Sequence, residues 1–122
     1  MGRSHGEKAE RFAQREYGFE PSDADTHDGV DGSTWYEVKS CQRRDSDGAK
    51  GRFRLWRQQH EALLEKDRSE TAWYVFVLYT SSGSYVSHKR VHASTVSVSS
   101  WNKGHPDGEQ FKLPYQDVFP LE

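Results

Sequence analysis

The sequence predicts one small α/β domain in which a mixed sheet is flanked by helices. Three observations predict this class: apolar residues at helical spacing near the start, an Asp-Gly turn followed by strand-forming residues, and an almost continuously apolar run over residues 72–80. Helices and strands that alternate in this way pack as layers around one core. The chain has 122 residues, of which 33% are hydrophobic and 13% aromatic, and this is sufficient for a single modest core.

The first element is expected to be a helix over residues 4–17, where apolar side chains share one helical face. Gly18 suits the left-handed conformation that often ends a helix. Ser4, followed three residues later by Glu7, fits a capping box at the start of the helix.

The second feature is a hairpin, predicted by the dipeptide Asp31-Gly32, which suits a two-residue type I′ turn. In that register Asp28 lies on the first strand, diagonally across from Glu37 on the second. Side chains alternate between the two faces of a strand, so Asp28, Glu37 and Lys39 are expected to share one face.

After a polar loop over 42–51, the rest of the chain predicts further elements in the order α, β and β. They are a helix over 52–66, a buried central strand over 72–80 and a returning strand over 84–91. From residue 92 the pattern is ambiguous between a strand and a short capped helix. We expect one domain over 1–122, with a core at about 5–91 and a C-terminal extension, 92–122, packed on it through its last apolar residues.

The net charge of −2 hides two oppositely charged stretches. Six acidic residues and no Lys or Arg lie from Glu20 to Glu37, whereas seven basic residues and two acidic ones lie from Lys39 to Arg57. A near-neutral net charge argues against a nucleic-acid partner. An acidic stretch followed directly by a basic one, however, suits a metal site beside a site that binds a polyanion. Two solvated loops of accidental composition are the alternative.

Asp28, Glu37 and Lys39 have the chemistry of a metal site that hydrolyses phosphodiesters. Two carboxylates on adjacent strands can hold Mg²⁺, and the main-chain carbonyl of Val38 can supply a further oxygen. Lys39 would orient the attacking water or stabilise the charge that develops on the phosphate. The alternative is an ordinary surface strand next to a polar turn.

These residues resemble the PD-(D/E)xK nuclease superfamily, with Asp28 as the motif Asp, Glu37-Val38-Lys39 as (D/E)xK, and Gly6-Glu7 at the acidic position of the first helix. The small size and element order are most similar to archaeal Holliday junction resolvases. The resemblance covers residues of about 5–80. It implies a restriction-endonuclease-like αβββαβ core, Mg²⁺-dependent cleavage of branched or duplex DNA with Mn²⁺ able to substitute, and often a homodimer.

The sequence departs from the family pattern in the first half of the motif. His27 precedes Asp28 where the family has Pro, and the interval from Asp28 to Glu37 is short. Asp31 is therefore a second choice for the motif Asp and for the metal ligand. The resemblance makes Glu7 an auxiliary metal ligand, whereas the capping box makes it a helix cap.

The stretch after the motif supplies candidates for binding nucleic acid. They are Arg43, Arg44, Lys50, Arg52 and Arg54, which would neutralise phosphates, and Gln59, which the resemblance places near the site. A restriction- or repair-type duplex endonuclease is the alternative function, and a non-catalytic nucleic-acid-binding module on the same scaffold is a further one. The single Cys excludes a disulfide framework, and no apolar run is long enough to span a membrane, so a cytoplasmic setting is expected.

Overall fold

The structure is a computed structural model that describes residues 4–122, with side chains from Gly6 onward. The helices and strands are α1 (Ser4–Tyr17), β1 (Glu20–Pro21), β2 (Gly29–Asp31), β3 (Thr34–Gln42), β4 (Arg52–Trp56), α2 (Arg57–Ser69), β5 (Thr71–Tyr79), β6 (Tyr85–His92) and β7 (Gln110–Pro114), with short 3₁₀ helices η1 (Ala93–Thr95) and η2 (Tyr115–Asp117). No helix within residues 4–122 is long and apolar enough to cross a membrane.

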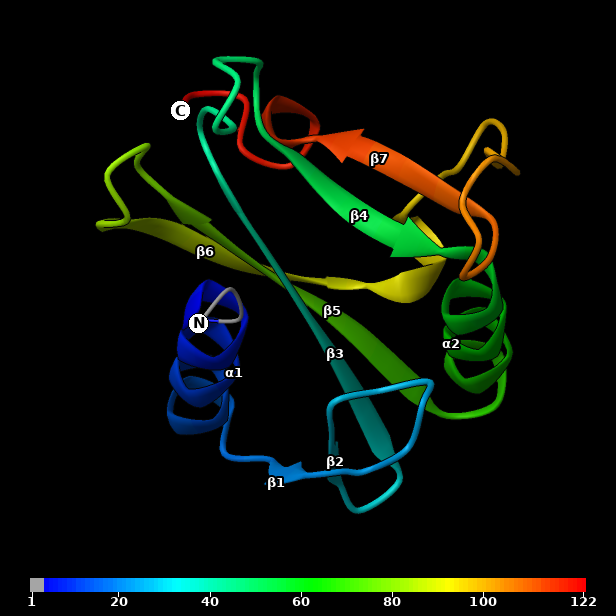
Figure 1. The fold of residues 1–122 in the computed structure, drawn as a ribbon. Helices are drawn as coiled ribbons and strands as arrows, with labels where there is room; N and C mark the ends of the chain where they lie inside the picture. The colour runs from blue at the N-terminus through cyan, green and yellow to red at the C-terminus, as the bar shows by residue number, and fades with distance from the viewer. Residues whose placement is uncertain (1–3) are drawn as a thin grey trace.

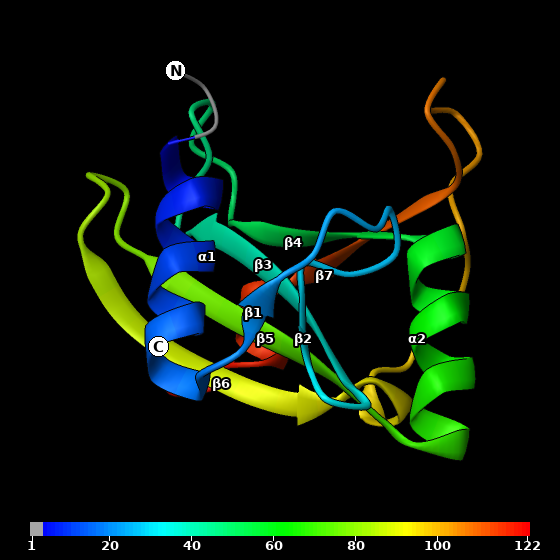
Figure 2. The same cartoon turned by 90° about the horizontal axis from the view of Figure 1, so that it is seen from below.

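A mixed five-stranded sheet in the order β1-β2-β3-β5-β6 forms the centre of the fold (Figure 1). Strands β3 and β5 run parallel and the other neighbours run antiparallel. Helix α1 packs on one face, where Ala9 and Ala13 join the cluster of buried residues that contains Tyr36 and Val38. Helix α2 and the two-stranded β4–β7 ribbon cover the other face (Figure 2). The predicted fold class, a central mixed sheet flanked by helices, is confirmed.

Helix α1 has the predicted bounds and the predicted C-terminal cap. Gly18 has a φ of 71°, which favours glycine, and its N–H donates to the carbonyl of Gln14 (2.8 Å). The proposed capping box depends on the side chain of Ser4, which lies outside the described side chains.

The β2–β3 hairpin has a different turn from the one predicted. Asp31 pairs with Thr34, so the turn residues are Gly32-Ser33. Gly32 has a φ of 60° at the first central position, as a type II′ turn requires, and Asp31 does not have a positive φ. The true pairing differs from the predicted one by two residues along the strand. A shift of two keeps every side chain on its predicted face. The pairing ends at Gly29, and the N–H of Asp28, the residue before it, donates to the carbonyl of Tyr36, which brings Asp28 next to Glu37.

The helix predicted over 52–66 is wrong in its first part. Residues Arg52–Trp56 form β4, which pairs antiparallel with β7, and α2 begins only at Arg57. Within β4, Phe53 and Leu55 are buried and the arginines on either side of Phe53 are exposed, which is the period of a strand. The partner strand lies far along the chain, so local spacing alone did not distinguish the two structures.

The C-terminal segment is part of the core. It begins with η1, contains no strand at Val96 or Val98, and continues into β7 and η2. Its apolar residues Leu113, Tyr115, Val118 and Phe119 lie in the same buried cluster as the inner side chains of β4 and β5.

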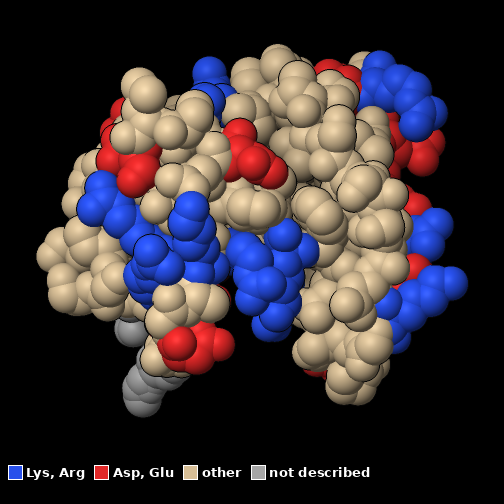
Figure 3. Space-filling view, turned by 90° about the horizontal axis from the view of Figure 1, so that it is seen from above, with Lys and Arg blue, Asp and Glu red and all other residues tan. Residues whose placement is uncertain are grey.

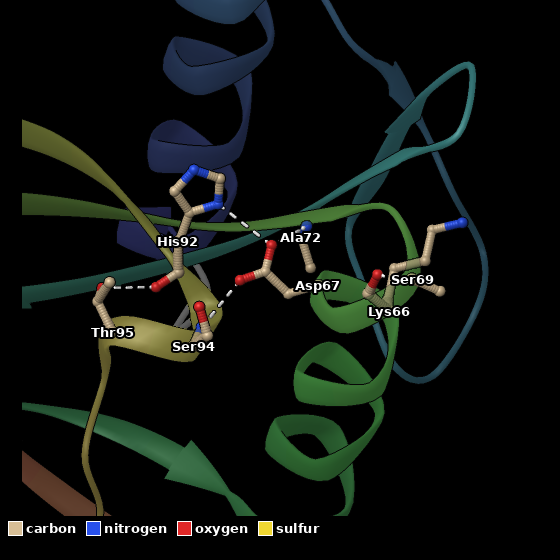
Figure 4. Close-up of polar contacts among 7 residues, drawn as sticks. All are labelled: Lys66, Asp67, Ser69, Ala72, His92, Ser94 and Thr95. Carbon is tan, nitrogen blue, oxygen red and sulfur yellow. Dashed lines mark hydrogen bonds and ion pairs between the residues drawn. The ribbon is translucent and has the colours of Figure 1, made fainter.

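A buried carboxylate joins the end of α2 to β5 and η1 (Figure 4). The side chain of Asp67 is 4% exposed and accepts hydrogen bonds from the N–H groups of Ala72 (3.0 Å) and Ser94 (3.1 Å), and it contacts Nδ1 of His92 (3.1 Å). Burial by itself would raise the pKa of Asp67, but these hydrogen bonds outweigh it and lower the pKa to about 2.

The variant Asp67→Asn is expected to lower the free energy of unfolding by about 2 kcal/mol at pH 7. An amide keeps the shape but cannot accept hydrogen bonds through its nitrogen. Because the folded pKa lies below the usual value, the stabilisation by Asp67 is present above about pH 4 and is lost as the pH falls towards 2. Urea unfolding at pH 7 and pH 3 measures this, and an equal loss at both pH values would contradict it.

Candidate active site

The candidate site lies on the face of the central sheet that α2 and the β4–β7 ribbon cover. Strand β3 directs Trp35 and Cys41 into the core cluster of this face, and alternation places Glu37 and Lys39 on the same face. In the parallel register Glu37 lies beside Tyr74 of β5. Asp28, just before β2, reaches the same position from the other side of β3.

Main-chain groups fix the position of Asp28. Its N–H donates to the carbonyl of Tyr36 (2.8 Å), and its Oδ2 accepts a hydrogen bond from the N–H of Val38 (2.8 Å). Alternate residues of a strand direct their N–H and C=O groups to the same edge, so the Val38 carbonyl also points to the side of Asp28. The carboxylate of Asp28 and the carbonyl of Val38 therefore lie at the same edge of β3.

Glu37 is a buried carboxyl group between a cation and another carboxyl group. Its side chain is 5% exposed, its Oε2 lies 3.1 Å from Nζ of Lys39, and its Oε1 is buried without a hydrogen-bond partner. Burial raises the pKa of Glu37 to about 8; Lys39 opposes the rise and the neighbouring Asp28 adds to it. At neutral pH a proton therefore resides in this site.

Lys39 is held by a chain of hydrogen bonds that leads to α2. Its Nζ donates to Oε1 of Gln59 (3.0 Å), and Nε2 of Gln59 donates to the carbonyl of Asp25 (2.9 Å). The side chain of Lys39 is 12% exposed, so its ammonium group has a fixed position near Glu37. Gln59, predicted near the site, is the residue that connects Lys39 to the loop before Asp28.

The donor set fits a hard divalent cation. Mg²⁺ takes one or two protein carboxylates and completes its shell with water and substrate phosphate. Asp28 and Glu37 supply two adjacent carboxyl groups, and the unpartnered Oε1 of Glu37 is an oxygen that a cation would satisfy. Among residues 4–122, no group of three or more His, Cys, Asp or Glu side chains is placed to hold a metal ion, so the protein ligands would be these two carboxylates.

The other acidic candidates occupy different positions. Asp31 is exposed beside the turn and, by alternation, lies on the face opposite to Glu37, which favours Asp28 over Asp31. Glu7 forms an ion pair with Arg11 one turn along α1 (3.8 Å).

Glu10 is a carboxyl group near Asp28 that the sequence pattern did not single out. Its pKa is raised by burial and then by the negative charges of Asp28 and Glu7. Glu10 follows the buried Ala9 and precedes the buried Ala13 by one helical turn, and this position beside the apolar stripe is the signal that could have identified it.

The basic candidates lie in the β3–β4 loop and on the outer face of β4. Two of them are engaged in ion pairs: Arg43 with Glu122 (2.9 Å) and Arg52 with Asp45 (3.8 Å). The ribbon adds Lys112, which lies opposite Arg54 on the same exposed face. Figure 3 looks onto this side of the molecule and shows Lys and Arg side chains gathered in adjacent groups. The acidic and basic stretches therefore occupy different parts of the fold, with β3 joining them.

A family model described as PD-(D/E)XK nuclease superfamily domain matches residues 1–120 of the chain. The chain belongs to the PD-(D/E)XK nuclease superfamily. No curated protein and no solved structure matches it significantly. Membership in the PD-(D/E)XK superfamily supports a nuclease-type function with nucleic acid as the substrate. Nucleases of this superfamily typically use divalent metals, in agreement with the donor set of Asp28 and Glu37.

Proposed function

We propose that this PD-(D/E)XK protein is a metal-dependent DNA endonuclease that hydrolyses phosphodiester bonds. The observation that carries the proposal is the contact between Asp28 and the buried Glu37, whose Oε1 has no partner, beside the fixed ammonium group of Lys39. Asp28 is only partly buried, but the buried Glu37 is costly to ionise beside this second carboxyl group unless a cation binds there.

Asp28 and Glu37 would hold Mg²⁺, with Mn²⁺ able to substitute, and the Val38 carbonyl would add an oxygen. A bound cation would polarise the scissile phosphate and lower the pKa of a coordinated water. Lys39, held by Gln59, would donate a hydrogen bond to the attacking water or to the phosphate oxygen that gains charge. Glu10 on α1 adds negative charge near Asp28, and Glu7, one turn before it, is the auxiliary acid that the resemblance indicates; neither is counted among the metal ligands.

The test is a nicking assay with labelled four-way junction, linear duplex and single-stranded DNA in Mg²⁺, in Mn²⁺ and in EDTA. We expect cleavage of at least one substrate in either metal and none in EDTA. Symmetric paired cuts restricted to the junction would identify a Holliday junction resolvase and imply a homodimer, and cuts in the duplex would identify a restriction- or repair-type enzyme. Binding of all three substrates without cleavage would reject the enzyme and identify a non-catalytic binding module.

The double variant Arg52→Ala/Arg54→Ala is expected to weaken DNA binding and to flatten its dependence on salt. Each lost phosphate contact lowers the slope of log K against log salt concentration by about 1, so a decrease of about 2 is expected. Titrations from low to high salt in EDTA measure the slope. The matched control Arg15→Ala/Arg68→Ala removes two exposed arginines from the last turns of α1 and α2. An equal slope for both double variants would contradict the assignment.

A further inference from the structure

A groove of about 890 Å³ adjoins the candidate active site. It lies between the start of α2, the loop at Asp25 and the segment over 103–109 that precedes β7. Two of its lining residues, Gln59 and Asp25, are the ones that connect Lys39 to the protein by hydrogen bonds. Its volume is in the range of pockets that bind small organic groups, about 300–1,000 Å³. A group bound in this groove would therefore lie beside a phosphate held at Lys39.

Trp56 supplies an aromatic wall of the groove. It is the last residue of β4, so the strand fixes its position, and the guanidinium of Arg54 lies 5.6 Å from the centre of its ring. The ring of His105 stands nearly perpendicular to the indole, at 76° and 5.0 Å between ring centres. Gly108 passes close to the indole edge. These contacts hold a rigid aromatic surface in place before any ligand binds.

The charges of the groove do not suit a path for phosphates. Arg57 is neutralised by Glu61 (2.8 Å) and Glu109 (3.0 Å), and the carboxylates of Asp25 and Asp107 outnumber the remaining cation, Lys103. Repulsion from the carboxylates disfavours a DNA backbone inside the groove. An uncharged aromatic ring has no such penalty.

A path for the backbone lies next to the groove on the outer face of the β4–β7 ribbon. Arg52, Arg54 and Lys112 are exposed there, and Trp56 follows the two arginines at the same period of two along β4. A strand whose phosphates lie along these cations would reach Trp56 with its next nucleotide. Figure 3 shows that basic side chains gather on this side of the molecule.

We infer that this groove receives an unpaired nucleobase, which stacks on Trp56, next to the phosphate that the enzyme cleaves. The substrate class is then DNA with an unpaired nucleotide at the cleavage point, as at a flap, a bulge or a branch. Paired bases are stacked inside the duplex and cannot enter such a groove without being unpaired at a cost. A base that is already unpaired does not incur this cost, so its stacking on an aromatic side chain contributes fully to binding. The inference rests on the proposed nuclease function, which puts the scissile phosphate beside Lys39.

The test measures binding in EDTA, where no cleavage occurs, with the full chain. One probe is a duplex with a single unpaired 2-aminopurine, and the other is the same duplex fully paired. We expect the wild type to bind the unpaired probe about tenfold more tightly and to quench its 2-aminopurine fluorescence. Trp56→Ala should lose both the preference and the quenching, and Trp56→Phe should retain part of each. The matched control Trp73→Phe alters a tryptophan near the start of β5, away from this groove and from Arg52 and Lys112, and should behave as wild type.

Equal affinity of the wild type for the two probes would overturn the inference. So would an equal loss of both affinities in Trp56→Ala, because that result indicates a general or structural role. The thermal midpoint of Trp56→Ala reports its folding, and if that variant is unfolded the partial loss of quenching in Trp56→Phe decides. Nicking in Mg²⁺ without a preference for unpaired nucleotides rejects this inference and keeps the endonuclease. Tighter binding of the unpaired probe without nicking of any DNA rejects the endonuclease function and supports the groove as a site for an unpaired base.

Discussion

The variant Glu37→Gln is expected to lower the nicking rate at least about a thousandfold while the protein remains folded. The amide has the shape of the carboxyl group, but it cannot supply the negative charge that holds a cation, and the lost stabilisation of a phosphoryl transition state amounts to several kcal/mol. Because burial raises the pKa of Glu37 to about 8, the amide also resembles the protonated form that the metal-free protein contains at neutral pH. Loss of activity should therefore occur without loss of structure.

Single-turnover nicking in Mg²⁺ measures the rate, and circular dichroism with a thermal midpoint reports the fold. Glu65→Gln, at an exposed position of α2, is the matched control and should nick at the wild-type rate. A Glu37→Gln variant that nicks at the wild-type rate would remove Glu37 from the reaction. A midpoint well below that of the wild type at pH 8 in EDTA would contradict the account of Glu37 as a buried acid.

In EDTA the wild-type protein is expected to lose stability as the pH rises from about 4.5 to about 8. The pKa of Glu37 is raised in the folded state, so the folded chain holds a proton that the unfolded chain releases over this range. Each pKa unit corresponds to about 1.4 kcal/mol, so the loss can reach about 5 kcal/mol at pH 8 and above. Saturating Mg²⁺ should reverse most of it, because a cation replaces the proton as the partner of the carboxylate.

Urea unfolding at pH 5, 6, 7 and 8, in EDTA and in Mg²⁺, measures this effect. The informative quantity is the difference in the free energy of unfolding between the wild type and Glu37→Gln. This difference cancels the contributions of His27 and His60, which also depend on pH. Burial lowers the pKa of both histidines, so their contribution rises with pH and opposes that of Glu37. A difference that does not change with pH would show that Glu37 is ionised in the metal-free protein.

The sequence was sufficient to predict the face that holds the candidate site, although the turn beside it was wrong. Side chains on a strand alternate with a period of two, and the error in the β2–β3 pairing was two residues. Asp28 therefore kept its face and came closer to Glu37 than predicted. Helix α1 and strand β5 were also predictable, because helical spacing and a buried apolar run are local signals.

The parts that the sequence did not predict depend on contacts between distant segments. The apolar residues of β4 suit a helix or a strand, and only the pairing with β7 decides between them. Glu10 and Glu7 are both polar residues of one helix, and their distances from Asp28 depend on how α1 crosses the sheet. The groove at Trp56 requires the segment over 103–109, which has no regular pattern of its own.

The role of the C-terminal segment in the core has a consequence for synthesis of the protein on the ribosome. Strand β7 completes the ribbon over the face that holds Glu37, and Phe119 lies in the cluster beneath it. The residues proposed to bind the metal emerge before the apolar cover that excludes water from them. A nascent chain or a chain terminated early would carry the acidic and basic residues without the dry site, and so without the proposed ability to cut DNA.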